Sequence, residues 1–144
     1  MTTTQRLSIL LWFRIAKFYH QSNKLSNEHV KAYDLSISQF DLLAQTYANQ
    51  PISQMDLAEK LLVTKGSITQ MLAKLEQREL IKREQQWRVK HISLTEKGKE
   101  LMEKALPDQS AFQSSLFSSL TTEEQKQLNH LLKKLQKGMT SQSN

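Results

Sequence analysis

Hydroxyl, amide and cationic side chains follow one another from Thr64 onward, and no carboxylate interrupts them before Glu76. Side chains of these types make two kinds of contact with a nucleic acid, because lysines pair with phosphates whereas amides hydrogen-bond to base edges. The amide of Gln70 suits adenine, which offers one acceptor and one donor side by side in the major groove. The segment therefore predicts a surface for double-stranded DNA, with Gln70 in contact with a base.

The spacing of the apolar residues predicts that this segment is an amphipathic helix. Ile68, Leu72 and Leu75 recur at the helical period and are expected to face the core, with Met71 beside them. The other residues are small, polar or cationic, so the helix can enter a major groove about 12 Å wide. They are Lys65, Gly66, Thr69, Gln70, Ala73, Lys74 and Gln77.

The expected DNA contacts divide into phosphate contacts and base contacts. Lys65 and Lys74 are expected to bind phosphates, and Thr69 a thymine methyl group or a phosphate. The preceding helix begins near Ser53, and its free backbone N–H groups can hold a further phosphate. For each of these residues the alternative is an ordinary place on the surface. The full predicted set is Ser53, Gln54, Lys65, Ser67, Thr69, Gln70, Lys74, Arg88 and Lys90.

Three closely spaced helix starts position this segment. In each, a residue with a capping hydroxyl follows an apolar residue that can clamp the entry angle of the chain. The predicted caps are Ser38, Ser53 and Thr64, and Pro51 marks the joint before the second. One such cap is ordinary helix punctuation. Their spacing, however, predicts short packed helices, the last two joined by a tight turn as in a helix-turn-helix.

A β-hairpin is expected after the second helix of this pair. Its strands are predicted at residues 81–84 and 87–94, with the turn at Gln85-Gln86. Ile92 and Leu94 fall on one side of the returning strand and would anchor it to the core. The result would be a small basic wing beside the recognition helix.

Two residues near the tip of this wing have different expected roles. Arg88 is expected to remain free for the narrow, negative minor groove. For Trp87 we considered packing under the hairpin, stacking on the sugar-phosphate edge and covering the tip, and we favour packing. The charge agrees with a role in DNA binding: residues 60–90 hold eight Lys and Arg against three Glu, in a chain of net charge +6. The alternative is a solvated basic surface.

Composition limits the classes of protein to which the chain can belong. Its 144 residues suit one domain with helical extensions, and three glycines with two prolines favour a mainly helical fold. No apolar run approaches the length needed to cross a bilayer. The absence of cysteine suits a cytoplasmic protein and leaves no thiolate ligand. We expect no metal, no cofactor and no enzymatic activity, because neither histidine clusters nor a phosphate-binding glycine loop nor a nucleophile motif is present.

The two ends of the chain suggest assembly. Between Leu7 and Tyr19 apolar residues occur nearly all round the predicted helix, which therefore needs cover on several sides. Near the other end, Thr121 starts a helix whose apolar stripe contains Leu128, Leu131, Leu132 and Leu135. A helix from about residue 96 to 117, broken at Pro107, would connect the wing to this end.

These patterns predict a homodimer with interlocking terminal helices, which would bind an inverted repeat with half-sites about 10 bp apart. The alternative is an intramolecular helical bundle. We expect a winged helix-turn-helix, mainly α with a small β-hairpin, in three parts: residues 1–33 (dimerisation), 34–95 (DNA binding) and 96–144 (dimerisation).

Several motifs resemble the MarR family of bacterial winged-helix transcriptional regulators. The similarity runs from about Leu10 to Leu135, and its most typical motif is Ile92-Ser93-Leu94-Thr95-Glu96-Lys97-Gly98. The resemblance implies an obligate dimer, a recognition helix in the major groove, and a wing arginine in the minor groove. It also implies transcriptional control in the cytoplasm, on nucleoid DNA, usually as repression relieved by a ligand or an oxidant.

This chain departs from the family in its wing. The family usually has an Asp-x-Arg element where this chain has Gln86-Trp87-Arg88, so the arginine is present and the carboxylate is not. The resemblance also suggests a pocket for a small-molecule effector, for which Trp12, Phe18, Phe40, Tyr47 and Met102 are the candidates. Aromatic residues at helical spacing more often belong to the core. The alternative function is a winged helix that binds another protein.

Overall fold

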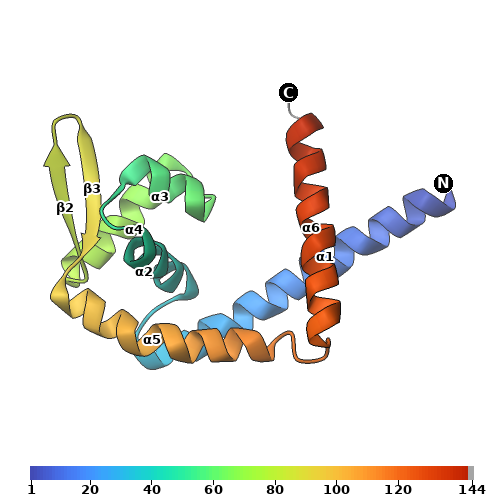
Figure 1. Ribbon diagram of the computed structural model, residues 1–144. Coiled ribbons are helices and arrows are strands. Elements are labelled where there is room, and N and C mark those ends of the chain that lie inside the picture. Colours follow the sequence, from blue (N-terminus) through green and yellow to red (C-terminus); the bar gives the residue numbers. More distant parts are fainter. Residues whose placement is uncertain (143–144) are drawn as a thin grey trace. The chain divides into compact units, whose positions relative to one another are not determined.

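The structure, a computed structural model, describes residues 1–142 and is mainly helical with one small antiparallel sheet, as predicted (Figure 1). Residue contacts divide the chain into two compact units, Met1–Ser110 and a second unit that begins at Ala111. The elements are α1 (Thr3–Val30), η1 (Lys31–Tyr33), α2 (Ile37–Asn49), β1 (Ile52–Ser53), α3 (Gln54–Leu61), α4 (Lys65–Gln77), β2 (Ile81–Gln86), β3 (Val89–Leu94), α5 (Glu96–Ser115) and α6 (Thr122–Gln142).

The sheet has the strand order β1-β3-β2, with both pairs antiparallel. The hairpin was predicted, but its turn is not at Gln85-Gln86. Gln86 pairs with Val89, so the turn is Trp87-Arg88. The short strand β1 was not predicted, and it pairs Ile52 with Ile92. Pairing on both sides of β3 sets the register of the hairpin, and a sequence pattern alone does not contain that constraint.

Two of the three predicted helix caps are confirmed. Ser53 accepts a hydrogen bond from the Asp56 N–H at 3.1 Å, and Thr64 caps α4 in the same way. The prediction of Ser38 is wrong, because Ser36 caps α2. Ser36 accepts from the Gln39 N–H, and the Gln39 side chain accepts from the Ser36 N–H. The capping box uses Glu or Gln three residues after the cap, and Ser36 has Gln39 there, whereas Ser38 is followed at that spacing by the shorter Asp41.

The predicted break of the helix at Pro107 is also wrong, because α5 continues through Pro107 to Ser115. Proline removes one backbone hydrogen bond, but contacts of the next turn hold this helix in place. His29 Nδ1 lies 2.8 Å from Gln109 Oε1, and the Tyr33 hydroxyl donates to Asp108 at 2.7 Å. These bonds tie the end of α1 and η1 to α5.

The buried core lies around the helix-turn-helix and the inner face of the sheet. Helices α2, α3 and α4 each contribute fully buried leucines, and β3 contributes Ile92 and Leu94, as predicted. The core residues are Val30, Leu35, Phe40, Leu42, Leu43, Ile52, Leu57, Ile68, Leu72, Leu75, Leu80, Ile81, Ile92, Leu94, Met102 and Ala105.

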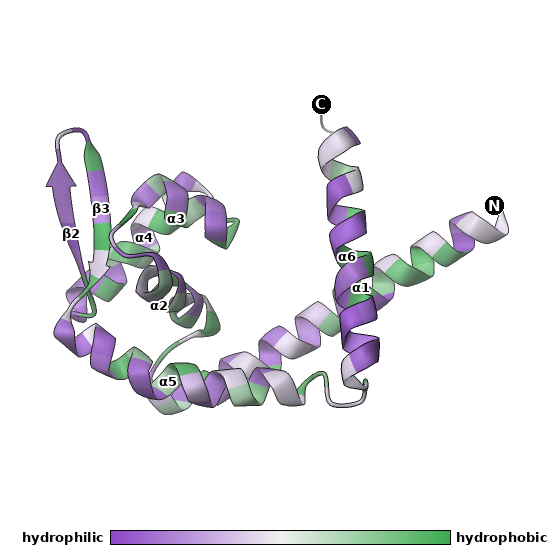
Figure 2. Ribbon diagram, viewed as in Figure 1, coloured by the Kyte–Doolittle hydropathy of each residue, from purple (hydrophilic) through white to green (hydrophobic). Residues whose placement is uncertain are grey.

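Two helices, each within its own unit, carry large exposed apolar side chains. On α1, Trp12, Phe13 and Tyr19 are 61–65% exposed. On α6, hydrophobic bands recur along an otherwise hydrophilic helix (Figure 2), and Leu131 and Leu135 are more than half exposed. Within the described residues, no helix combines the length and apolar character needed to span a membrane.

Candidate nucleic-acid interface

Helix α4 has the two faces that the sequence predicts. Ile68, Leu72 and Leu75 are completely buried, and Met71 is partly buried beside them. The opposite face is exposed along its whole length. It presents Lys65, Gly66, Ser67, Thr69, Gln70, Ala73, Lys74 and Gln77.

The joint between α3 and α4 is made by a residue in an unusual backbone conformation. Leu62 has φ 56° and ψ 41°, in the left-handed region that favours glycine, and its side chain is 93% exposed. The next residue, Val63, donates its N–H to the Ala58 carbonyl at 3.1 Å. This left-handed cap ends α3 and turns the chain sharply toward Thr64.

A side-chain hydrogen bond fixes α4 against α3. The Gln54 amide donates to the Thr69 hydroxyl at 2.9 Å, and that hydroxyl donates to the Lys65 carbonyl at 2.9 Å. Both polar groups are therefore engaged within the protein. Gln54 thus links the start of α3 to α4, and the methyl group of Thr69 makes no part of this link.

The carboxylate on α4 that lies nearest the wing is neutralised from the wing. Arg83 on β2 donates two hydrogen bonds to Glu76, at 3.0 and 3.1 Å. These hydrogen bonds, assisted by the charges of Arg83 and Lys90, hold the pKa of Glu76 below its ordinary value. The same contact raises the pKa of Arg83. Sequence analysis missed this pair, whose partners are seven residues apart on different elements.

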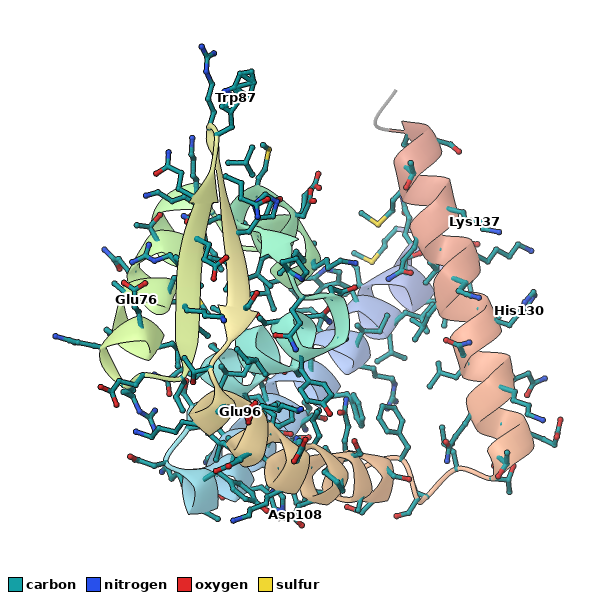
Figure 3. The ribbon with its side chains drawn as sticks, turned by 60° about the vertical axis from the view of Figure 1, so that its left-hand side comes forward. Glu76, Trp87, Glu96, Asp108, His130 and Lys137 are labelled. Carbon is teal, nitrogen blue, oxygen red and sulfur yellow. The ribbon has the colours of Figure 1, made fainter. Side chains whose placement is uncertain are left out.

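The tip of the wing projects into solvent. Trp87 and Arg88 form the turn, and Figure 3 shows Trp87 at the very end of the hairpin. The prediction that Trp87 packs under the hairpin is wrong, since its side chain is 87% exposed. Its φ of 62° lies in the left-handed region and turns the chain back into β3.

The predicted contact residues thus fall into two groups. Lys65, Ser67, Gln70 and Lys74 lie on the exposed face of α4, with Ser53 at the start of α3. On the wing, Arg83 of β2 reaches Glu76 near the end of α4, and Lys90 of β3 and Arg88 of the turn lie farther along the hairpin. These residues thus provide four cations, Lys65 and Lys74 on α4 and Arg88 and Lys90 on the wing, on two elements of the same unit.

The five residues of the predicted effector pocket have different surroundings. Phe40 and Met102 are buried in the core, and Tyr47 packs against it. Trp12 and Phe18 are exposed on α1, at 65% and 43%. A cavity of about 500 Å³ lies elsewhere, between the end of α2, α3 and His91 of β3, and none of the five residues lines it.

Comparison with known proteins agrees with this geometry. The sequence model of the MarR family matches residues 35–86. A helix-turn-helix-type transcriptional regulator of Bacillus cereus (strain ATCC 10987), itself uncharacterized, is 50% identical over 129 residues, which cover 89% of this chain and 88% of the relative.

Solved structures are similar over nearly the whole chain. AbsC, a MarR family transcriptional regulator from Streptomyces coelicolor, has a TM-score of 0.85 at 20% identity, covering 98% of this chain and 97% of AbsC. MepR from S. aureus, solved as a complex with DNA, has a TM-score of 0.78 at 28% identity, covering 90% of this chain and 96% of MepR.

Proposed function

The chain belongs to the MarR family and is a DNA-binding transcriptional regulator. From this we propose that it is a sequence-specific repressor in the cytoplasm. It binds an inverted-repeat operator as a homodimer. The observation that carries the proposal is the exposed face of α4. That face presents amide, hydroxyl and cationic groups, and Arg83 neutralises Glu76 at its edge.

Each predicted contact has a distinct role in this proposal. Gln70 contacts a base in the major groove, and the methyl group of Thr69 meets a thymine methyl. Lys65, Lys74 and Ser67 bind phosphates, as does the start of α3 at Ser53, where Gln54 supports α4 through Thr69. On the wing, Arg88 enters the minor groove and Lys90 binds its phosphate edge.

Support for the dimer comes from α1 and α6. Exposed apolar side chains as large as those of Trp12, Phe13 and Leu131 occur on helices that are otherwise well formed. Burial removes such side chains from water at a gain of about 25 cal/mol per Å². A two-fold dimer would present two copies of α4 to successive major grooves, about 10 bp apart.

The proposal includes release of the DNA by a small-molecule effector. Trp12 and Phe18 offer aromatic faces that a dimer would cover, and Phe40, Tyr47 and Met102 lie in or against the core. A flat apolar compound between these groups would alter the placement of α1 and so release DNA. Titration of uncharged planar aromatic compounds into the protein–operator complex, followed by DNA anisotropy, tests this step.

The function is tested by selecting bound sequences from a random pool of DNA duplexes at two salt concentrations. We expect an inverted repeat to be enriched, and binding to weaken steeply with salt. Gln70→Ala should weaken operator binding by about 1–3 kcal/mol and relax the preference for the base that Gln70 contacts. Lys65→Ala should reduce the slope of log affinity against log salt concentration by about one. Gln127→Ala, which removes the same amide from the exposed surface of α6, is the matched control.

Two outcomes would contradict the proposal. In the first, no sequence is enriched, and neither Gln70→Ala nor Gln127→Ala changes the affinity for DNA. This result would exclude sequence-specific recognition by α4. Absence of DNA binding, or binding insensitive to salt, would favour the other function considered for this fold, a winged helix that binds a protein partner.

A further inference from the structure

The turn of the wing contains a large aromatic side chain that the fold does not use. Trp87 has φ 62°, a conformation in which hairpin turns favour Gly, Asn or Asp over a bulky residue. Its side chain is 87% exposed, so packing does not account for a tryptophan there. An outside contact would account for both observations.

The charges around Trp87 indicate the chemistry of its partner. The hairpin between Ile81 and Leu94 holds four Lys and Arg residues and a single carboxylate, Glu84, which lies 3.8 Å from Lys82. Arg88 is the next residue in the turn, and Lys90 follows on β3. An exposed aromatic ring next to Arg88, on a hairpin with an excess of cations, suits a polyanion with flat, apolar parts, namely a nucleic acid.

The distance between α4 and Trp87 is similar to the separation of adjacent major and minor grooves. Arg83 is held against Glu76 of α4, and Trp87 lies four residues farther along the strand, or about 13 Å at 3.3 Å per residue. Adjacent major and minor grooves are separated by half a helical turn, roughly 17 Å. When α4 occupies the major groove, the length of the indole side chain makes up the difference between these two distances.

We propose that Trp87 contacts DNA directly, with its indole in the minor groove beside Arg88, against the sugars and the edge of a base step. This inference rests on the proposed function. Apolar side chains that enter the minor groove partly unstack the step they contact, and pyrimidine–purine steps yield most easily. Trp87 thereby makes the protein selective at operator positions that α4 does not reach.

The first test follows the indole itself. The chain has two tryptophans, so Trp12→Phe leaves Trp87 as the only one. On addition of the selected operator, we expect its emission to shift and its quenching by acrylamide to fall several-fold. The matched control is Trp87→Phe, which leaves only Trp12 and should show no comparable protection at saturating DNA.

The second test measures affinity. Trp87→Ala should weaken operator binding roughly five- to a hundred-fold without changing the salt slope, since no charge is lost. Trp87→Phe should retain most of the affinity, and Arg88→Ala should reduce the salt slope. The thermal unfolding of Trp87→Ala should match the parent, because the side chain is exposed.

The outcomes separate this inference from the proposed function. If Trp87 stays fully accessible to acrylamide in a complex that Gln70→Ala disrupts, the inference is wrong and the function stands. Equal operator affinity of Trp87→Ala and the parent would overturn it as well. If the parent binds no DNA, both fail together.

Discussion

Gly98 of α5 lies against the backbone of Leu80, so closely that a Cβ on Gly98 would collide with the Leu80 carbonyl oxygen. The carbonyl carbon would lie only 3.0 Å from that Cβ. Neighbouring residues secure the same contact, because the Thr95 N–H donates to the Leu80 carbonyl at 3.2 Å and the Lys97 ammonium donates to the Arg78 carbonyl at 3.1 Å. The start of α5 thus holds the end of α4.

Gly98→Ala should therefore destabilise the protein. The obstructing atoms are backbone and cannot rotate away, so we expect a loss of about 1–3 kcal/mol, typical of overpacking. Urea unfolding measures it. The matched control is Gly138→Ala in α6, where a Cβ meets nothing within 4 Å and alanine should stabilise the helix by up to about 1 kcal/mol. Equal stability of the two variants would contradict the close packing of Gly98.

Thr69→Val should loosen α4 from α3 while preserving the shape of the side chain. It removes the hydroxyl that accepts from Gln54, whose Oε1 is already buried without a hydrogen-bond partner among the described residues. This hydrogen bond lies at an exposed site, where the loss of a hydrogen bond costs about 0.5–1.5 kcal/mol, so chemical unfolding should show a loss in that range. Thr69→Ser retains the hydroxyl and should stay within a few tenths of a kcal/mol of the parent, apart from the lost methyl contact. A Thr69→Ser loss as large as that of Thr69→Val would show that the hydrogen bond is not responsible.

The Glu76–Arg83 pair should make stability depend on pH in acid. The pKa of Glu76 is lowered in the folded protein from its ordinary value of 4.5, so the unfolded state takes up the proton first as the pH falls. The stabilisation is present above about pH 4.5 and is lost as the pH falls through the lowered value. Glu76 is partly exposed, so we expect less than about 1 kcal/mol. Urea unfolding at neutral and acid pH measures the free energy of unfolding of the parent and of Glu76→Gln. The two values should converge at low pH, and a difference that does not change with pH would contradict the contribution of this pair.

The same pair should also influence DNA binding. Arg83→Ala leaves Glu76 as an unpaired carboxylate on the recognition helix, which repels phosphate. The single variant should bind DNA more weakly than the double variant Arg83→Ala/Glu76→Ala, in which no carboxylate remains. Anisotropy titrations of the parent, both single variants and the double variant form a double-mutant cycle. Additive losses would mean that neutralisation of Glu76 does not matter for binding.

Leu131→Lys should weaken the proposed dimer. Leu131 is 55% exposed on the apolar stripe of α6, and a lysine there would be buried without a partner on assembly. We expect dimer affinity to fall at least about tenfold, and operator affinity with it, as seen by analytical ultracentrifugation and anisotropy. His130→Lys is the control, since His130 lies on the side of α6 that carries Lys137 (Figure 3). A parent that sediments as a monomer would overturn the dimer itself.

The local sequence determined those features whose stabilising partners lie within a few residues along the chain. The caps Ser53 and Thr64 bond to N–H groups three residues away, and the period of Ile68, Leu72 and Leu75 defines the buried face of α4. The exposed, basic face opposite follows from the same period. The wing could be predicted from its alternating residues, and the family resemblance from motifs along the chain.

Tertiary structure decided the features whose partners are distant in sequence or lie on another element. The register of β3 depends on both β1 and β2, and it moved Trp87 to the tip of the wing. The bonds Gln54–Thr69 and Arg83–Glu76 join separate elements, and Gly98 is required only because α5 reaches Leu80. Sequence periodicity identifies which side of an element is buried, but the residue that meets each side chain is known only once the elements have packed.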